Sequence, residues 1–233
     1  VRQYEHYRWL QIGGDSLQGL IDIDSPNQLL FPNMSALMLS LLVCPEPKRL
    51  LNLGFGSGSI ERFFNANASD LAITSVEPNP HVVKLAKTFF FIEDDVDVIN
   101  ASAEAFLSKA ETTYDIIFCD IFNNDAHPTC LYDEQFYADL YRCLNKEGMV
   151  AMNLLPESEE DILDILLQMK HYFSQIALLE VPNHFNAILY ASNCPLPETE
   201  SLGAAAEELL QQIDIDLRDL PQRLNKLMER IET

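Results

Sequence analysis

From residue 49 onward, short apolar segments alternate regularly with amphipathic segments, and this alternation restricts the chain to few folds. Short apolar runs are typical of buried strands, and the longer runs between them have helical spacing. Strand–helix–strand units of this kind form a mostly parallel sheet, covered on both faces and joined by right-handed crossovers. We therefore predict an α/β protein with a doubly wound, seven-stranded sheet whose strands cover residues 49–54, 71–77, 96–101, 114–120, 148–155, 175–181 and 187–192.

The last two of these strands have no helix between them, which predicts an antiparallel hairpin at one edge of the sheet. Five amphipathic segments, which we expect to be helices, separate the other strands and cover residues 59–67, 80–91, 103–109, 133–144 and 158–173. Asp133 is placed to cap the fourth of these helices.

The segments before this alternation are expected to be small additions to the sheet domain. Residues 7–24 have apolar-rich runs on either side of a Gly-Gly-Asp turn at 13–15, and predict a short N-terminal β-hairpin. Residues 33–43 predict a buried helix capped by Asn33 or Ser35. Two prolines that follow this helix then interrupt the chain.

The C-terminal segment has leucines at helical spacing. This spacing predicts two amphipathic helices, over residues 202–213 and 217–231, that pack on the domain or on a second subunit. The predicted division of the chain is an N-terminal hairpin and helix over 1–47, a nucleoside-binding catalytic domain over 48–200, and C-terminal amphipathic helices over 201–233.

The charge balance limits the classes of partner. The 233 residues include 15 Lys or Arg and 36 Asp or Glu, which gives a formal net charge of −21. Nucleic-acid binders need a basic face to neutralise phosphates, and anionic membranes attract basic segments. We therefore expect neither a nucleic-acid nor a membrane partner. The charge is compatible with a cationic substrate, although acidity of this size mostly serves solubility.

Other patterns favour a cytoplasmic protein without a metal. No apolar run approaches the ~20 residues of a membrane span, and the first residues show no signal-peptide pattern. The cysteines form no CxxC pair, so we expect reduced thiols; they are Cys44, Cys119, Cys130, Cys143 and Cys194. Cys119, within an apolar run, is expected to fill the core. The histidines match no metal-ligand spacing; they are His6, His81, His127, His171 and His184.

The strongest local motif is a glycine-rich turn between the first predicted strand and the first helix of the alternation. Gly54, Gly56 and Gly58 stand in the pattern G-x-G-x-G. Glycines at such a turn let the backbone adopt positive φ and approach a ligand closely. The spacing differs from the G-x-G-x-x-G that binds a pyrophosphate, and no Lys-Ser or Lys-Thr of a P-loop follows. The turn alone is equally compatible with a tight strand–helix bend.

An acid at the end of the next strand favours the ligand-binding interpretation. Glu77 lies 19 residues after Gly58, where a carboxylate can accept hydrogen bonds from both ribose hydroxyls. A nucleoside without phosphates in a doubly wound sheet indicates S-adenosylmethionine or a close relative.

Asp120 ends the fourth predicted strand. Ligands of such sheets bind at the carboxyl ends of the parallel strands, where Asp120 lies. A carboxylate there can hold a cationic substrate and accept a proton from an amine. The alternative is that Asp120 caps a helix or orders its loop. In the following loop, Asp125 and His127 are weaker candidates, because loop residues of these types often face solvent or form turns.

The motifs together resemble the spermidine/spermine synthases. The resemblance covers about residues 8–192 and is carried by the runs LNLGFGSGSIERFF, VEPNPHVVKLAKTFF, VINASAEAFL, YDIIFCDIF and LYDEQFYADLYRCLNKEGMVAMNL. The segment LQIGGDSLQG resembles the N-terminal hairpin of that family, which carries a substrate-site Gln, here Gln18. The glycine turn is shared by all class I methyltransferases. More typical of the aminopropyltransferases is the spacing of Asp120, Pro128, Leu131, Phe136, Tyr137 and Gly148.

The resemblance implies a Rossmann-like class I methyltransferase fold, usually dimeric, and transfer of an aminopropyl group from decarboxylated S-adenosylmethionine to putrescine or a related amine. It implies that the glycines line the nucleoside, that Glu77 holds the ribose and that Asp120 holds the donor amine and deprotonates the acceptor. Ser102 takes the place of the Asp that contacts the adenine amino group. The predicted nucleoside site also includes the neighbouring residues Phe55, Pro78 and Ala103.

The acceptor side departs from the family pattern. Phe31 replaces the Tyr that contacts the acceptor amine, and Asn33 replaces the acid or Gln beside it. Asn123 replaces the second acid of the loop after Asp120. The predicted acceptor site therefore consists of Gln18, Phe31, Asn123 and Asp125. These departures indicate a divergent spermidine-synthase-like branch, and loss of charged hydrogen bonds should weaken binding of a dication.

Three functions remain open at this point. The first is aminopropyl transfer, and the second is methyl transfer from S-adenosylmethionine to an unknown small molecule. The third is a non-catalytic ligand-binding relative, because activity does not follow from fold alone.

Overall fold

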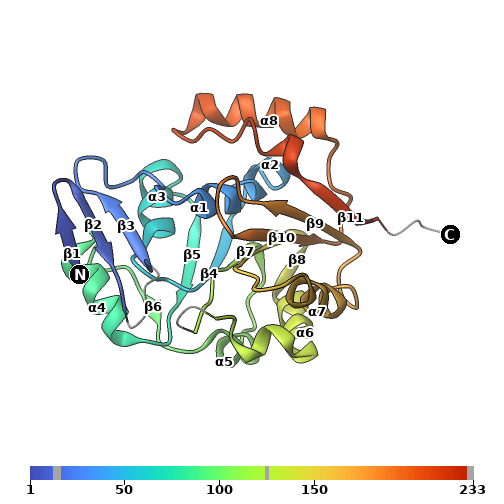
Figure 1. Cartoon of the computed structure of the whole chain (residues 1–233), viewed down its shortest axis with the longest axis horizontal. Helices are drawn as coiled ribbons and strands as arrows, with labels where there is room; N and C mark the ends of the chain where they lie inside the picture. Colours follow the sequence, from blue (N-terminus) through green and yellow to red (C-terminus); the bar gives the residue numbers. More distant parts are fainter. Residues whose placement is uncertain (13–16, 124–125, 230–233) are drawn as a thin grey trace.

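The computed structural model describes residues 1–12, 17–123 and 126–229, and Figure 1 shows a central twisted sheet with helices on both faces. Within these residues the sheet has eight strands in the order β11-β9-β10-β8-β7-β4-β5-β6. Their bounds are Arg49–Leu53 (β4), Ala72–Val76 (β5), Val98–Ile99 (β6), Tyr114–Cys119 (β7), Leu144–Leu154 (β8), Gln175–Glu180 (β9), Ala187–Ser192 (β10) and Asn225–Glu229 (β11).

The five strands from β6 to β8 are parallel, and helical crossovers connect them. These helices are α3 (Ser59–Asn67), α4 (Pro80–Phe89), α5 (Ala103–Leu107) and α6 (Glu134–Cys143), and α7 (Glu159–Met169) follows β8. The predicted α/β class and mostly parallel sheet are confirmed. The predicted cap is also confirmed, because the Asp133 side chain accepts a hydrogen bond from the Gln135 N–H at the start of α6.

Alternating side chains of the buried strands form two cores, one on each face of the sheet. Leu50 and Phe118 pack on the face covered by α1 (Pro32–Leu37), α2 (Ser40–Val43), α3 and α8 (Thr199–Gln212). Leu51 and Ile117 pack on the face covered by α5, α6 and α7. Figure 1 shows these two helical layers above and below the strands. Cys119 is completely buried, as predicted for a core residue.

The C-terminal prediction of a helix over residues 217–231 was wrong for residues 217–229, and the last two lie outside the described residues. The first of the two expected helices exists as α8, but the chain then forms a 3-10 turn over Pro221–Arg223 and strand β11, which pairs antiparallel with β9. Pro221 disfavours a helix interior because it lacks an N–H. Strand β9 also offers backbone donors and acceptors that need partners. Within the described residues the sheet therefore has eight strands instead of seven, and β11 pairs with β9, so the hairpin of β9 and β10 is not at the edge as predicted.

The N-terminal prediction was partly correct. Strands β2 (Tyr7–Leu10) and β3 (Gly19–Asp22) form the expected hairpin, whose turn at 13–16 lies outside the described residues. A further strand, β1 (Arg2–Tyr4), makes this a three-stranded antiparallel sheet. Figure 1 shows it beside α4.

The expected helix over residues 33–43 is divided into α1 and α2. The first helix begins at Pro32, and Phe31 is its N-cap, without a side-chain capping bond. The prediction that Asn33 or Ser35 is the N-cap was therefore wrong. Pro32 at the first helical position suits this start, because its missing N–H would have no helical partner there. The Ser40 hydroxyl donates to the Leu37 carbonyl oxygen where the two helices meet.

Candidate functional site

The glycine turn joins the C-terminal end of β4 to the start of α3. Gly54, Gly56 and Gly58 all have positive φ, at 98°, 54° and 73°, and Gly58 is the N-cap of α3. A Cβ on Gly54 would lie 2.1 Å from the Asp120 carbonyl oxygen. A glycine is therefore required where the turn crosses the end of β7. The Gly54 N–H donates to the Val76 carbonyl oxygen at 3.0 Å, which binds the turn to β5 as well.

Glu77 follows β5 and faces the glycine turn. One carboxylate oxygen accepts the Gly56 N–H at 3.4 Å, and the other accepts the Asn79 N–H at 3.0 Å. Glu77 is buried, and burial raises the pKa of its carboxyl group. The two N–H donors lower that pKa. A carboxylate has about four acceptor positions, so it can still accept hydroxyl groups from a ligand. The predicted juxtaposition of the turn with this acid is therefore present.

An asparagine that sequence reasoning missed supports the loop after Glu77. Asn100 follows β6, and its Nδ2 donates to the carbonyl oxygens of Glu77 and Pro78 at 3.0 and 2.9 Å. These bonds fix the backbone next to the carboxylate. The signal in the sequence was a polar residue near the end of the predicted strand over 96–101, where ligands of such sheets bind.

Ser102 and Ala103 lie at the beginning of α5. The Ser102 hydroxyl accepts the Ala105 N–H at 3.4 Å and is the N-cap of that helix. The hydroxyl predicted to contact adenine therefore already has one structural partner, and its second lone pair and its proton are the groups that a ligand could use.

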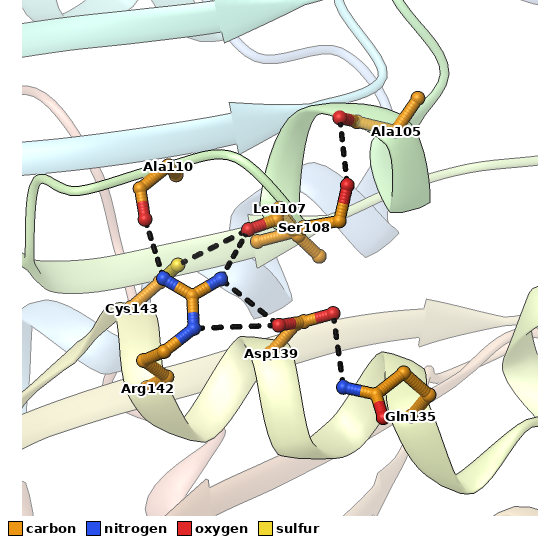
Figure 2. A network of polar contacts seen from close by, with 8 residues as sticks. All are labelled: Ala105, Leu107, Ser108, Ala110, Gln135, Asp139, Arg142 and Cys143. Carbon is orange, nitrogen blue, oxygen red and sulfur yellow. Dashed lines mark hydrogen bonds and ion pairs between the residues drawn. The ribbon is translucent and has the colours of Figure 1, made fainter.

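Arg142 of α6 anchors the other end of α5 (Figure 2). Its guanidinium donates to the carbonyl oxygens of Leu107 and Ala110, and it forms an ion pair of 2.9 Å with Asp139. The Asp139 hydrogen bond raises the pKa of Arg142. Carbonyls at a helix end need such donors, so this network fixes the position of α5 and of Ser102 at its start.

Asp120 lies directly after β7, next to the glycine turn. Its backbone N–H donates to the Leu53 carbonyl oxygen at 2.8 Å, so the backbone is held against the end of β4. One carboxylate oxygen, Oδ1, accepts a hydrogen bond of 2.6 Å from Asn153 Nδ2. Burial raises the pKa of Asp120 to about 6, although the Asn153 bond lowers it. A base whose pKa lies close to neutral pH is suited to proton transfer.

Two amides behind Asp120 were also missed by sequence reasoning. Asn153 is in β8, and its Oδ1 accepts a hydrogen bond of 3.0 Å from Asn186 Nδ2. Asn153 was detectable as a polar residue within an apolar strand. Asn186 was not, because its contact depends on how the β9–β10 hairpin pairs with β8.

His127 attaches the loop after Asp120 to the end of β8. Its Nε2 accepts the Leu155 N–H at 2.8 Å, and its Nδ1 lies 3.3 Å from the Tyr132 hydroxyl. An accepting Nε2 requires the neutral ring, and burial lowers the pKa of His127 in agreement with this. His127 is therefore a loop anchor.

The predicted acceptor residues come from three different segments of the chain. Gln18 lies beside the glycine turn, and a Cβ on Gly56 would be 3.0 Å from the Gln18 carbonyl oxygen. Phe31 is half-buried at the start of α1, and Asn123 exchanges backbone hydrogen bonds with Ala126. Asp125 lies outside the described residues.

Within residues 1–12, 17–123 and 126–229, no three His, Cys, Asp or Glu side chains are grouped as metal ligands. No helix in this part of the chain is long and apolar enough to span a bilayer. Burial raises the pKa of the Cys119 thiol well above its usual range, so this side chain stays neutral beside Asp120.

The fold and the site together define a class I methyltransferase-like transferase domain. Solved structures agree with this class. A probable spermidine synthase from Corynebacterium glutamicum has a TM-score of 0.75 and 19% identity, over 92% of this chain and 81% of that one. Human methyltransferase-like protein 13 in complex with SAH has a TM-score of 0.67 and 21% identity, over 78% of this chain and 88% of that one.

Sequence comparison identifies the family. The spermine/spermidine synthase domain model matches residues 37–193, so the chain belongs to that family of transferases. A polyamine aminopropyltransferase of Chromobacterium violaceum is 25% identical over 97% of this chain and 88% of its own length. A second, from Sodalis glossinidius, is 25% identical over 83% of this chain and 73% of its own length.

Proposed function

We propose that this protein transfers an aminopropyl group from decarboxylated S-adenosylmethionine to putrescine or a related small amine. The observation that carries the proposal is Asp120, a carboxylate with a raised pKa at the end of β7, beside the glycine turn and on the same edge of the sheet as Glu77. Family membership supports aminopropyl transfer as the reaction class. The neighbouring structure of a spermidine synthase with the transition-state analogue AdoDATO (TM-score 0.61) supports the donor class.

The described residues fit a nucleoside donor. Gly54 and Gly56 have positive φ and carry no side chain, which lets the backbone of the turn approach a ligand closely. Glu77 has acceptor positions left for ribose hydroxyls, and the start of α5 offers the Ser102 hydroxyl for the base. Phe55, Pro78 and Ala103 belong to the same proposed site.

Asp120 has two tasks in this reaction. Amines have pKa values near 10, so the acceptor arrives protonated and must lose a proton before it can attack. The Asp120 carboxylate holds the ammonium group and takes that proton. The nitrogen lone pair then forms the new C–N bond at the aminopropyl carbon, while the C–S bond breaks and its electron pair returns to sulfur as a neutral thioether. Holding the two reactants in line supplies much of the acceleration.

Gln18, Phe31, Asn123 and Asp125 form the proposed acceptor side. Two of these side chains are amides and one is aromatic, so the site offers fewer charges to a second ammonium group than the family pattern does. We therefore expect weak binding of putrescine relative to the donor. A cytoplasmic homodimer stays a prediction.

Calorimetry with three ligands tests the donor. We expect decarboxylated S-adenosylmethionine and methylthioadenosine to bind, and putrescine to strengthen donor binding. Preference for intact S-adenosylmethionine by tenfold or more, about 1.4 kcal/mol, with no effect of putrescine, would instead assign methyl transfer. Absence of binding for all three would leave a family member whose site has lost its ligand.

Asp120→Asn tests the catalytic role. This variant should bind the donor within about threefold of wild type and lose turnover by roughly 10²–10⁴-fold, the usual contribution of a general base. Asp70→Asn is the matched control, because it removes the same charge from an exposed position at the opposite end of the sheet. An unchanged rate for Asp120→Asn would refute the assignment.

A further inference from the structure

Asn186 lies where the β9–β10 hairpin closes, next to the end of β8. Its backbone carbonyl accepts the Val181 N–H at 2.9 Å, and the antiparallel register places Ala187 opposite Leu154. This register brings the Asn186 side chain to Asn153, a residue that is only 2% exposed. Asn186 is thus held by the hairpin at its backbone and by β8 at its side chain.

The two amides form a directed chain of hydrogen bonds that ends at Asp120. Asn186 Nδ2 donates to Asn153 Oδ1 at 3.0 Å, and Asn153 Nδ2 donates to Asp120 Oδ1 at 2.6 Å. An amide has an oxygen that only accepts and a nitrogen that only donates. If Asn153 were turned over, its oxygen would face the carboxylate and its nitrogen would face the donor of Asn186. The bond from Asn186 therefore selects the orientation in which Asn153 supports the carboxylate.

We propose that Asn186 is a positioning residue that acts through the Asn153 amide to hold the Asp120 carboxylate in its working orientation. With Oδ1 occupied by Asn153, the other oxygen, Oδ2, receives no hydrogen bond from the described residues and is left for an ammonium group. The inference deepens the proposed function, because its kinetic consequence rests on Asp120 being the base of that reaction. The hydrogen-bond chain itself is testable without any substrate.

The expected effect is a change in the titration of Asp120. A donor to a carboxylate stabilises its charged form, so loss of the donor raises the pH at which Asp120 loses its proton. The thiol of the preceding Cys119 stays neutral because it is completely buried. We expect Asn153→Leu to raise the titration midpoint of Asp120 by about one pH unit. At a given pH this changes the ratio of charged to neutral Asp120 about tenfold. Asn186→Leu should raise the midpoint by a smaller amount.

The double variant separates positioning from general packing. Since Asn186 acts only through Asn153, Asn153→Leu with Asn186→Leu should titrate like Asn153→Leu alone, whereas independent effects would add. Asn145→Ala is the matched control. Asn145 Nδ2 donates to Asp115 Oδ1 at 2.6 Å between the same two strands, at the end of the sheet away from the site. This control should leave the titration of Asp120 unchanged.

Two readouts keep this inference distinct from the proposed function. Carboxyl ¹³C NMR of the ligand-free protein, with Asp120→Asn for assignment, measures the midpoint directly. The acid limb of the kcat/KM profile for aminopropyl transfer should move by the same amount. Shifted NMR midpoints without turnover in wild type would support the positioning role and refute the aminopropyl assignment. An unshifted midpoint in Asn186→Leu, or additive shifts in the double variant, would refute the positioning role.

Discussion

Replacing Gly54 by alanine should destabilise the protein strongly, because two separate costs coincide at this position. The backbone has φ of 98°, and a left-handed conformation costs an L residue about 1–2 kcal/mol. The added Cβ would also lie 2.1 Å from the Asp120 carbonyl oxygen, which is backbone and cannot rotate away. Overpacking of this kind costs about 1–3 kcal/mol. The expected loss is therefore about 2–5 kcal/mol, out of a total stability of roughly 5–15 kcal/mol.

Two other glycines give a graded comparison. Gly56 has φ of 54°, within the left-handed region, and its Cβ would be 3.0 Å from the Gln18 carbonyl oxygen, so Gly56→Ala should cost about 1–2 kcal/mol. Gly203 lies within α8, and nothing lies within 4 Å of its added Cβ. Gly203→Ala should therefore stabilise the protein by about 0.5–1 kcal/mol.

Urea unfolding at 25 °C, followed by circular dichroism, measures all three variants. From the most to the least stable, the expected order of the free energy of unfolding is Gly203→Ala, wild type, Gly56→Ala and then Gly54→Ala. A loss below about 1 kcal/mol for Gly54→Ala would refute the reasoning, because it would mean that the end of β7 moves aside at little cost. Donor affinity should fall in the same order for the two turn variants.

Two further predictions concern buried polar groups away from the turn. Burial raises the pKa of Glu61 above 4.5 in the folded protein, so its contribution to stability is present at low pH and is lost as the pH rises through the folded pKa. The urea concentration at the unfolding midpoint should therefore fall less above pH 4.5 in Glu61→Gln than in wild type. The same pH dependence in both proteins would contradict this. The completely buried Tyr190 donates to the Ala36 carbonyl oxygen at 2.7 Å. Tyr190→Phe should cost about 1 kcal/mol in urea unfolding, against less than about 0.5 kcal/mol for the control Tyr172→Phe, which removes an exposed hydrogen bond to Glu134.

The juxtaposition of the glycine turn, Glu77 and Asp120 was predictable from sequence because it depends on local signals. The glycine turn, Glu77 and Asp120 each directly follow a strand. The carboxyl ends of parallel strands all lie at the same end of the sheet. Once the alternation of strands and helices is recognised, these residues must come together. Their mutual contacts, such as Gly56 with Glu77, follow from the strand order and need no knowledge of loop geometry.

Features that depend on pairing between distant segments were not predictable. Leucines after residue 216 have helical spacing, yet the backbone pairs with β9, because an open strand edge outweighs a weak local preference. The contact of Asn186 with Asn153 depends on the register of an antiparallel hairpin. A shift of one residue in that register would turn the Asn186 side chain to the other face of the sheet.

A comparison of two carboxylates with raised pKa values shows why Asp120 is the one that we propose as a base. Glu61 accepts hydrogen bonds from Asn52 and Ser75 on one oxygen at 2.7 and 2.6 Å, and within the described residues its other oxygen is buried without a partner. Burial raises the pKa of Glu61, the two donors act in the opposite direction, and the carboxyl group is enclosed in the core. Asp120 also has one oxygen supported by an amide, but it lies at the end of a strand and is only half-buried. Burial raises both pKa values, and the position of Asp120 at the carboxyl end of β7 is what the proposed exchange of a proton with a ligand requires.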